Sequence, residues 1–268
     1  MKTLQDYKII PPPDILRNHV RYFWTLDVSM TTTTAAVFHA YVDHSLGISF
    51  QVGCNQSVLL HNNTLIPIGM LHGLNTVPST VQYNCSFSSF GLVFYPHVIK
   101  EIFGMDACHF TNAQISIEDH IEPFLTEEVV TAANSRKRIE IITAYLLNKL
   151  NKKTAQGALA KNFIHYIQSN AGIVTVKDLV SAFNTTERQI ERLFKEQVGV
   201  TPRHFIKTER FQKALQQIAA NTTSLTEIAY SLQYADQSHF IRHVRQLSGL
   251  SPKQLQKKYQ KTAINIIL

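Results

Sequence analysis

Polar side chains on one short segment near the end of the chain are candidates for binding chemistry. Arg188, Glu191 and Arg192 alternate with the apolar residues Ile190 and Phe194. On a helix, this spacing turns the apolar side chains inward and leaves the polar ones on the opposite face. An exposed arginine can donate two hydrogen bonds to O6 and N7 of guanine, and a glutamate can accept one from N4 of cytosine. Such a face can contact bases in duplex DNA, contact phosphate, or be a solvated basic surface, and the residues by themselves leave these alternatives open.

The segment that holds these residues is repeated once in the chain, in similar form. Residues 176–202 read VKDLVSAFNTTERQIERLFKEQVGVTP, and residues 225–252 read LTEIAYSLQYADQSHFIRHVRQLSGLSP. Each copy predicts a short helix, a tight turn and a longer helix that begins at Thr186 or Asp236, which is the helix-turn-helix pattern. Between them lies a stretch that suits a helix of about 20 residues, or about 30 Å. That length is close to the ~34 Å between successive major-groove segments on one side of B-DNA. A helical-repeat scaffold is the alternative, but two copies are few for a solenoid.

Helix start and stop signals recur throughout this half of the chain. A hydroxyl residue followed three positions later by an acid or amide predicts a helix start in three places. These pairs are Thr175 with Asp178, Thr186 with Gln189, and Ser224 with Glu227. A hydroxyl directly before proline predicts two more starts, at Thr201-Pro202 and Ser251-Pro252. Helices are expected to stop at Gly199 and Gly249. Together, these start and stop signals predict that the residues beyond 161 are all helical.

Charge divides the chain in the same way as the helix signals. Residues 1–150 carry 9 Lys and Arg against 12 Asp and Glu, a net charge of −3, whereas residues 151–268 carry 17 against 7, a net charge of +10. A basic surface attracts a polyanion, of which nucleic acid is the commonest in a cytoplasm. No secretory signal and no apolar run of about 20 residues is visible, so a cytoplasmic protein without a membrane span is expected.

The first half of the chain predicts a β-rich unit followed by helices. Short β-prone runs separated by Gly, Asn and Asp indicate a small antiparallel barrel or sandwich. A short helix is expected to end at Gly104, and a pair of helices is expected between residues 121 and 150. The second of the pair carries an apolar stripe, which is either core or the seam of a weak homodimer. The stripe consists of Ile139, Ile142, Leu146, Leu147 and Leu150. Residues 151–157 are polar and are interpreted as an interdomain linker.

Residues from about 160 to 260 resemble the DNA-binding domain of the AraC/XylS family of bacterial transcription regulators. The residues that match the family pattern in the first copy are Thr186, Ile190, Arg192, Phe194, Lys195, Gly199, Pro202, Phe205, Arg210 and Ala214. Those in the second are Ile228, Ala229, Asp236, Ser238, Phe240, Arg242, Gly249, Ser251 and Pro252. The chain departs from the pattern at Gln233-Tyr234, where the family has Gly-Phe, and at Val244-Arg245, where it has Phe-Lys. A glutamine at positive φ would cost on the order of 1 kcal/mol.

The resemblance implies which side chains touch DNA. Base contacts map to Arg188, Glu191 and Arg192 in the first copy and to Ser238, His239 and Arg242 in the second. Phosphate contacts or plain surface charges are expected at Lys195, Lys207, Arg210, Lys213, Arg245 and Lys253. For Arg210, in the connecting helix, a structural role is a further alternative. The predicted DNA-binding residues are these six base contacts together with Lys195 and Arg245.

The first half resembles the cupin-like sensing domains of the same family, by position rather than by motif. Cupin enzymes hold a metal with histidines and a carboxylate, but here the H-x-H pair is missing, and no metal, catalytic residue or cofactor is expected. The histidines considered as metal ligands are His39, His44, His61 and His72. The chain also has three cysteines, Cys54, Cys85 and Cys108, which are expected to be reduced thiols.

The predicted architecture is α+β, with two domains. Residues 1–150 form a cupin-like antiparallel β-barrel with following helices, for sensing or dimerisation, and residues 157–268 form two helix-turn-helix units joined by a long helix. The implied function is a sequence-specific transcription regulator that is not an enzyme. Its implied partners are double-stranded DNA, RNA polymerase and a small-molecule effector in the barrel. The alternatives are an effector-free protein-interaction module in the N-terminal half, or a metal-dependent cupin enzyme fused to a DNA-targeting domain.

Overall fold

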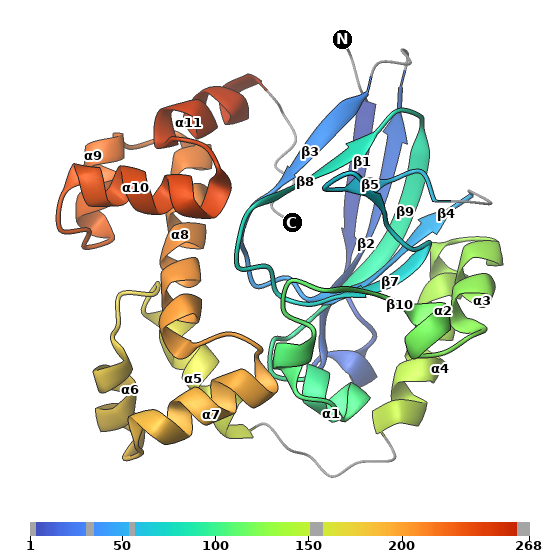
Figure 1. The fold of residues 1–268 in the computed structure, drawn as a ribbon, viewed down its shortest axis with the longest axis horizontal. Coiled ribbons are helices and arrows are strands. Elements are labelled where there is room, and N and C mark those ends of the chain that lie inside the picture. The colour runs from blue at the N-terminus through green and yellow to red at the C-terminus, as the bar shows by residue number, and fades with distance from the viewer. Residues whose placement is uncertain (1–3, 31–34, 54–56, 151–157, 262–268) are drawn as a thin grey trace.

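The chain divides into a β-rich part and a helical part. The computed structural model describes residues 4–30, 35–53, 57–150 and 158–261 of the 268. The N-terminal part, up to residue 150, holds all the described strands and ends in helices, and the C-terminal part, from residue 158, is helical (Figure 1). The predicted α+β class is confirmed. The predicted linker, residues 151–157, and Cys54 lie outside the described residues.

The larger sheet has six antiparallel strands in the order β1-β2-β9-β4-β7-β10. They are β1 (Leu4–Ile10), β2 (Val20–Ser29), β9 (Phe87–Phe94), β4 (Gly47–Val52), β7 (Gly69–His72) and β10 (Gln114–Ser116). The central strands β4 and β9 are buried along nearly their whole length. Strands covered on both faces read as continuous apolar runs, which is why "FSSFGLVF" shows no clean alternation.

The smaller sheet has four strands in the order β3-β8-β5-β6. They are β3 (Ala36–Ala40), β8 (Ser79–Tyr83), β5 (Leu60–His61) and β6 (Thr64–Leu65). Asn62 and Asn63 join β5 to β6 with φ of 49° and 67°, the left-handed conformation that a tight two-residue hairpin needs. The described strands are therefore hydrogen-bonded into two sheets rather than into one closed barrel, and the cupin likeness stays a prediction.

Short helices follow the strands of the N-terminal part. They are η1 (Asp14–Leu16), α1 (Ile99–Phe103), η2 (Ala107–His109), α2 (Ile117–His120), α3 (Leu125–Thr131) and α4 (Ser135–Leu150). Gly104 ends α1 with φ of 74°, as predicted. Helices α3 and α4 are the predicted pair, and α3 packs against strand β4 of the larger sheet.

The apolar stripe of α4 packs against its own chain. Ile142 and Leu146 are 0% exposed inside the main hydrophobic core. Ile139, Leu147 and Leu150 are half-buried against the same core. The two residues at the centre of the stripe are not available to a second chain, so the predicted dimer seam is wrong for them. A homodimer through another surface stays a prediction.

Seven helices make up the described C-terminal part. They are α5 (Ala158–Ser169), α6 (Val176–Phe183), α7 (Glu187–Gln197), α8 (Pro202–Ala220), α9 (Leu225–Ser231), α10 (Gln237–Ser248) and α11 (Pro252–Lys261). The predicted starts are confirmed, with reciprocal capping boxes at Thr175 and Ser224. Gly249 ends α10 with φ of 74°. None of the helices described is long and apolar enough to span a bilayer.

The two parts of the chain share one hydrophobic core. A single cluster of buried residues continues from the larger sheet through α1 to helices α5, α7 and α8. The Thr111 hydroxyl donates a hydrogen bond to the Gly199 carbonyl at 2.6 Å. A Cβ on Gly199 would lie 2.7 Å from the Ala107 carbonyl oxygen, so a glycine is needed for this close approach as well as for its φ of 94°. Lys100 lies 2.8 Å from Asp106 and 3.0 Å from Glu196, which adds an ion pair across the junction.

Candidate nucleic-acid interface

The first helix-turn-helix unit consists of α6 and α7. Asn184 ends α6 in the left-handed conformation, with φ of 46°, and Thr186 caps α7 by accepting a hydrogen bond from the Gln189 N–H at 3.2 Å. Ile190 and Phe194 are 0% exposed, so they fix the inner face of α7. The turn and the cap thus set the orientation of the second helix, as the spacing predicted.

The outer face of α7 carries the four candidate residues predicted on it. Arg188, Glu191, Arg192 and Lys195 are all exposed. None of them forms an ion pair with a carboxylate or cation in the described residues, whereas the neighbouring Glu187 is held by Arg203 at 3.1 Å. The structure therefore brings the four side chains together on one free face, which runs from Arg188 in the first turn to Lys195 in the last.

The second unit consists of α9 and α10, and it adopts the predicted turn despite its unusual residues. Gln233 has φ of 53°, so the strained conformation expected at this position is present. Tyr234 is buried, and its hydroxyl lies 2.7 Å from Nδ1 of His243. Phe240 and Val244 are 0% exposed, so the smaller valine is accommodated in the core.

Three of the four candidate residues predicted on the outer face of α10 are exposed to solvent. Ser238, Arg242 and Arg245 are exposed, and neither arginine forms an ion pair within the described residues. His239 is only half-buried, since its ring packs edge-on against Tyr234 with 5.3 Å between the centroids. It therefore presents less of its ring to a ligand than the outer-face prediction assumed.

Arg210 is a structural residue, one of the two roles open to it from the sequence. Its Nε and Nη2 donate hydrogen bonds to the Gly172 carbonyl at 3.0 and 2.9 Å. Its guanidinium also lies 5.8 Å from the centre of the Tyr234 ring. From α8, this side chain ties the loop before α6 to the turn before α10. Lys213 also forms an ion pair, in which its Nζ lies 3.8 Å from Oε1 of Glu209.

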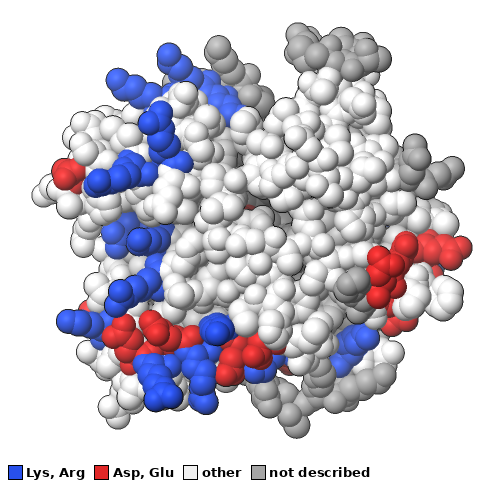
Figure 2. Space-filling view, viewed as in Figure 1, with Lys and Arg blue, Asp and Glu red and all other residues white. Residues whose placement is uncertain are grey.

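A basic groove connects the two units. It lies between α6, α8 and α10, and its cationic lining residues are Lys177, Arg203, Lys207, Arg210 and Arg242. Figure 2 shows Lys and Arg side chains running down the helical side of the molecule, from α11 toward α7. Lys177 was missed from the sequence because its short helix α6 gave no reason to expect it beside α10. Lys207, a predicted phosphate contact, is exposed in this groove, and Lys253 is exposed on α11.

A cavity of about 180 Å³ lies between the two sheets of the N-terminal part. His61 and His72 line it, and burial lowers the pKa of His61 and lowers that of His72 to about 4. His39 lies on β3 and is exposed. In the described ranges, no three His, Cys, Asp or Glu side chains gather as metal ligands would.

The segment from Tyr41 to Ser45 separates this cavity from the helices. Tyr41 and Ser45 line the cavity. Val42, between them, faces the C-terminal part: its N–H donates to the Leu247 carbonyl at 3.0 Å, and its carbonyl accepts from Gln212 Nε2 at 2.7 Å. The alternation of an extended chain thus places one set of side chains in the cavity and the other against α8 and α10.

His44 anchors the same segment to α8. Its ring stacks on Phe205 with 3.8 Å between centroids, and its Nε2 lies 3.2 Å from Oε2 of Glu209. All three side chains are buried. His44 therefore packs between the two parts of the chain rather than in the cavity with His61 and His72.

Two families match different parts of the chain. A family described as "Helix-turn-helix domain" matches residues 179–258, which include both units. A family described as "Domain of unknown function (DUF6597)" matches residues 8–116, which include both sheets.

Several curated relatives match the chain over part of their length. A probable transcriptional regulator, LumQ of Photobacterium leiognathi, is 32% identical over 31% of this chain and 34% of its own. The HTH-type transcriptional regulator MtrA of Neisseria gonorrhoeae is 28% identical over 50% of this chain and 46% of its own. The HTH-type transcriptional activator RhaS of Escherichia fergusonii is 26% identical over 49% and 48%. The chain thus spans half or less of the length of these relatives.

Two solved structures are similar to this chain at low identity and with TM-scores below 0.5. ToxT from Vibrio cholerae is 12% identical, covers 88% of this chain and 98% of its own, and has a TM-score of 0.49. The C-terminal domain of AraT, a response regulator from Geobacillus stearothermophilus, is 20% identical over 43% of this chain and 94% of its own, with a TM-score of 0.37.

Proposed function

We propose that this chain is a sequence-specific DNA-binding transcription regulator of the AraC type, because residues 179–258 match a family described as a helix-turn-helix domain. Helices α7 and α10 are the two reading elements. Residues 157–268 act as the DNA-binding domain and residues 1–150 as the sensing domain. The relatives MtrA and RhaS, named as a transcriptional regulator and a transcriptional activator, support this proposal.

The observation that carries the proposal is the pair of free arginine-bearing faces on α7 and α10. Arg192 and Arg242 occupy corresponding positions on these helices, and both are exposed without an ion-pair partner in the described residues. The connecting helix α8 has 19 residues, so its length is about 28 Å. This is near the distance between successive major-groove segments on one side of B-DNA. We assign Arg188, Arg192 and Arg242 to guanine edges and Glu191 to a cytosine amino group.

The test is a comparison of specific and non-specific binding by the full chain, since the helical part shares its core with the sheets. A cognate duplex is first selected from a random pool. Arg192→Ala and Arg242→Ala are each expected to weaken binding to that duplex by about 1–3 kcal/mol, and to weaken binding to random DNA much less.

Two variants serve as matched controls. Lys207→Ala, in the groove, is expected to weaken cognate and random binding alike and to reduce the salt dependence, because a phosphate contact releases counterions on either sequence. Arg203→Ala removes an arginine already paired with Glu187 and is expected to change binding less than either reading arginine. Equal losses on both duplexes for Arg192→Ala and Arg242→Ala would contradict their role in base recognition.

We also propose that the N-terminal part senses a small effector and that the chain is not an enzyme. The cavity between the two sheets supports an effector site over an effector-free interaction module. The segment from Tyr41 to Ser45 supplies a route for control, because it lines the cavity on one side and is hydrogen-bonded to α8 and α10 on the other. RNA polymerase is the proposed partner that the DNA-bound regulator acts on.

A further inference from the structure

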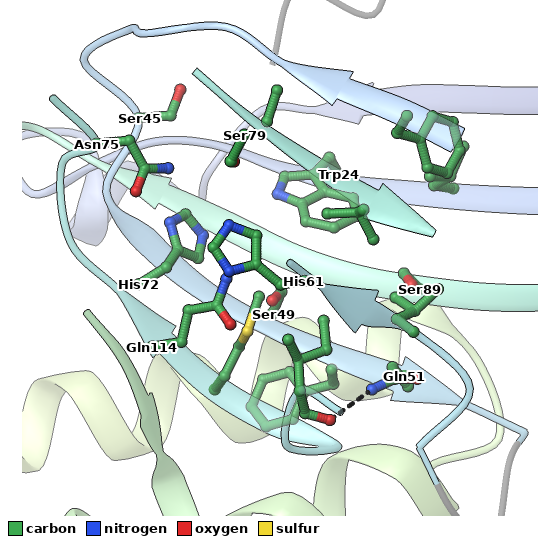
Figure 3. A pocket seen from close by; sticks show the side chains of 18 of the residues that line it. Trp24, Ser45, Ser49, Gln51, His61, His72, Asn75, Ser79, Ser89 and Gln114 are labelled. Carbon is green, nitrogen blue, oxygen red and sulfur yellow. Dashed lines mark hydrogen bonds between the residues drawn. The ribbon is translucent and has the colours of Figure 1, made fainter. Parts of the chain in front are cut away.

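The cavity between the two sheets is more polar at one end than over the rest of its lining. The polar end is next to the segment that contacts the helices, and Asp43 and Ser45 of that segment line it. Ser45, Asn75, His72 and Gln114 lie together on this side of the cavity in Figure 3. The ends differ in what they can hold, so the cavity orients an asymmetric ligand.

Aromatic and aliphatic side chains make up most of the rest of the lining, interrupted by Ser49, Gln51, Ser79 and Ser89. Trp24 and Leu26 come from the larger sheet, Phe38 from the smaller one, and Phe87 from the start of β9. The Phe38 and Phe87 rings meet edge to face with 6.2 Å between their centroids, which fixes this wall. An engineered cavity of about 150 Å³ with such a lining takes benzene, so the 180 Å³ here suits a ligand with a single ring.

The charge of the lining is one-sided. Among the described residues that line the cavity, Asp43 is the one acidic side chain, and no lysine or arginine lines it. Arg21 and Lys258 each approach an aromatic ring of the lining, at 5.8 and 5.3 Å from the centres of Tyr22 and Tyr41, but neither lines the cavity. A ligand carboxylate would therefore meet no cation of the lining itself, whereas a ligand cation would meet the Asp43 carboxylate, which Arg21 influences only from outside the lining.

Asp43 is held in place for such a contact. Its Oδ1 accepts a hydrogen bond from the Ser45 N–H at 2.9 Å, which fixes the carboxyl group at the polar end. Burial raises the pKa of Asp43, and a positive charge beside it would favour the ionised form.

The histidines at this end are neutral and add hydrogen-bonding groups without adding charge. Burial lowers the pKa of both His61 and His72, so neither ring repels a cation at neutral pH. Nε2 of His61 is buried and has no hydrogen-bond partner within the described structure. A ligand that supplies the hydrogen bond missing at such a buried nitrogen would bind more favourably.

We infer that the cavity binds a small amine with one aromatic ring, whose ammonium group pairs with the Asp43 carboxylate while the ring packs among Trp24, Phe38 and Phe87. This inference rests on the proposed function in taking the cavity as the effector site, and it adds the chemical class of the effector. The aromatic faces of the lining also favour a cation.

Three ligands of similar shape and different charge test the inference on the wild-type chain by isothermal titration calorimetry at pH 7. They are phenethylamine, 2-phenylethanol and phenylacetate. The amine is expected to bind about 10–100-fold more tightly than the alcohol, because it gains a hydrogen bond between charged groups, and phenylacetate is expected to bind most weakly. Equal binding of amine and alcohol, preference for phenylacetate, or no binding of the amine would each overturn the inference.

Asp43→Asn tests the carboxylate itself. The amide keeps an oxygen that can accept from the Ser45 N–H, so the segment should keep its shape, and the unfolding temperature of the free protein checks this. The variant is expected to lose the preference for the amine over the alcohol, and Asp14→Asn, at an exposed aspartate paired with Arg17, is expected to retain it. An undiminished preference in Asp43→Asn would contradict the assigned ion pair.

DNA binding by the same unliganded samples separates this inference from the proposed function. DNA binding without amine binding would overturn the ligand class and leave the regulator proposal intact. Amine binding without binding to any duplex would support the cavity assignment and count against the regulator proposal.

Discussion

Replacing Arg210 by alanine is expected to lower the free energy of unfolding more than it lowers the affinity of the folded protein for DNA. The guanidinium donates two hydrogen bonds to one carbonyl, that of Gly172, and lies over the Tyr234 ring. These contacts join α8 to the loop before α6 and to the turn before α10. Their loss therefore affects how the two reading helices are held rather than what they touch.

The expected loss follows from these contacts. A hydrogen bond from a charged donor contributes about 1.5–3 kcal/mol, and the two bonds are counted as one because they share a single acceptor oxygen. The contact with the aromatic ring adds about 0.5–1 kcal/mol at a partly exposed site. The sum is about 2–4 kcal/mol, a large share of the stability of an ordinary domain.

Urea unfolding followed by circular dichroism measures the loss, and a binding titration at low temperature measures the affinity of the folded variant. Arg210→Lys keeps the charge without the forked pair of donors and is expected to recover only part of the stability. Lys207→Ala, an exposed position on the same helix, is the control and should leave stability within about 0.5 kcal/mol of wild type. The reasoning is refuted if Arg210→Ala unfolds like wild type while its affinity for DNA falls as far as that of Lys207→Ala.

Two further predictions concern the cores. Leu146→Ala is expected to lower the free energy of unfolding by about 2–5 kcal/mol, because the side chain is 0% exposed. Leu147→Ala, at a half-buried position, should lower it less, and equal losses in urea unfolding would contradict this packing. The second concerns three buried histidines whose pKa values burial lowers to about 4, namely His72, His97 and His243. Between about pH 6.5 and 4 the unfolded chain binds protons that the folded chain does not, so stability should fall as the pH is lowered, by up to about 1.4 kcal/mol per pH unit for each histidine. Unfolding titrations across this window should show a shallower slope for His97→Gln than for wild type, and an equal slope would contradict the prediction.

The helical half could be predicted in detail because its signals are local. A capping hydroxyl and an acid three residues later act within one turn, so Thr175 and Ser224 mark their helices whatever lies nearby. The inner and outer faces of α7 follow from the spacing of Ile190 and Phe194 for the same reason. Even the positive φ at Gln233 could be anticipated, from its place in a turn that favours glycine.

The N-terminal half was predictable in class but not in arrangement. Composition and turn residues indicate antiparallel strands, yet the pairing of β2 with β9 joins residues some 60–70 positions apart, and no local pattern encodes that choice. The apolar stripe on α4 shows the same limit: its spacing suits either a dimer seam or a core. Only the packing of Ile142 and Leu146 against the rest of their own chain decides between them.

The helix-turn-helix units, their caps, the outward faces of α7 and α10 and the basic character of that half can all be predicted from the amino-acid order, since each depends on residues within a few turns of one another or on composition. Other features appear only once the elements are packed: Arg210 binds the Gly172 carbonyl, Lys177 borders a groove with α10, and the adjacent residues His44 and Asp43 contact a helix and line a cavity respectively. These depend on side chains brought together from distant parts of the chain, and their meeting is set by the packing of whole elements.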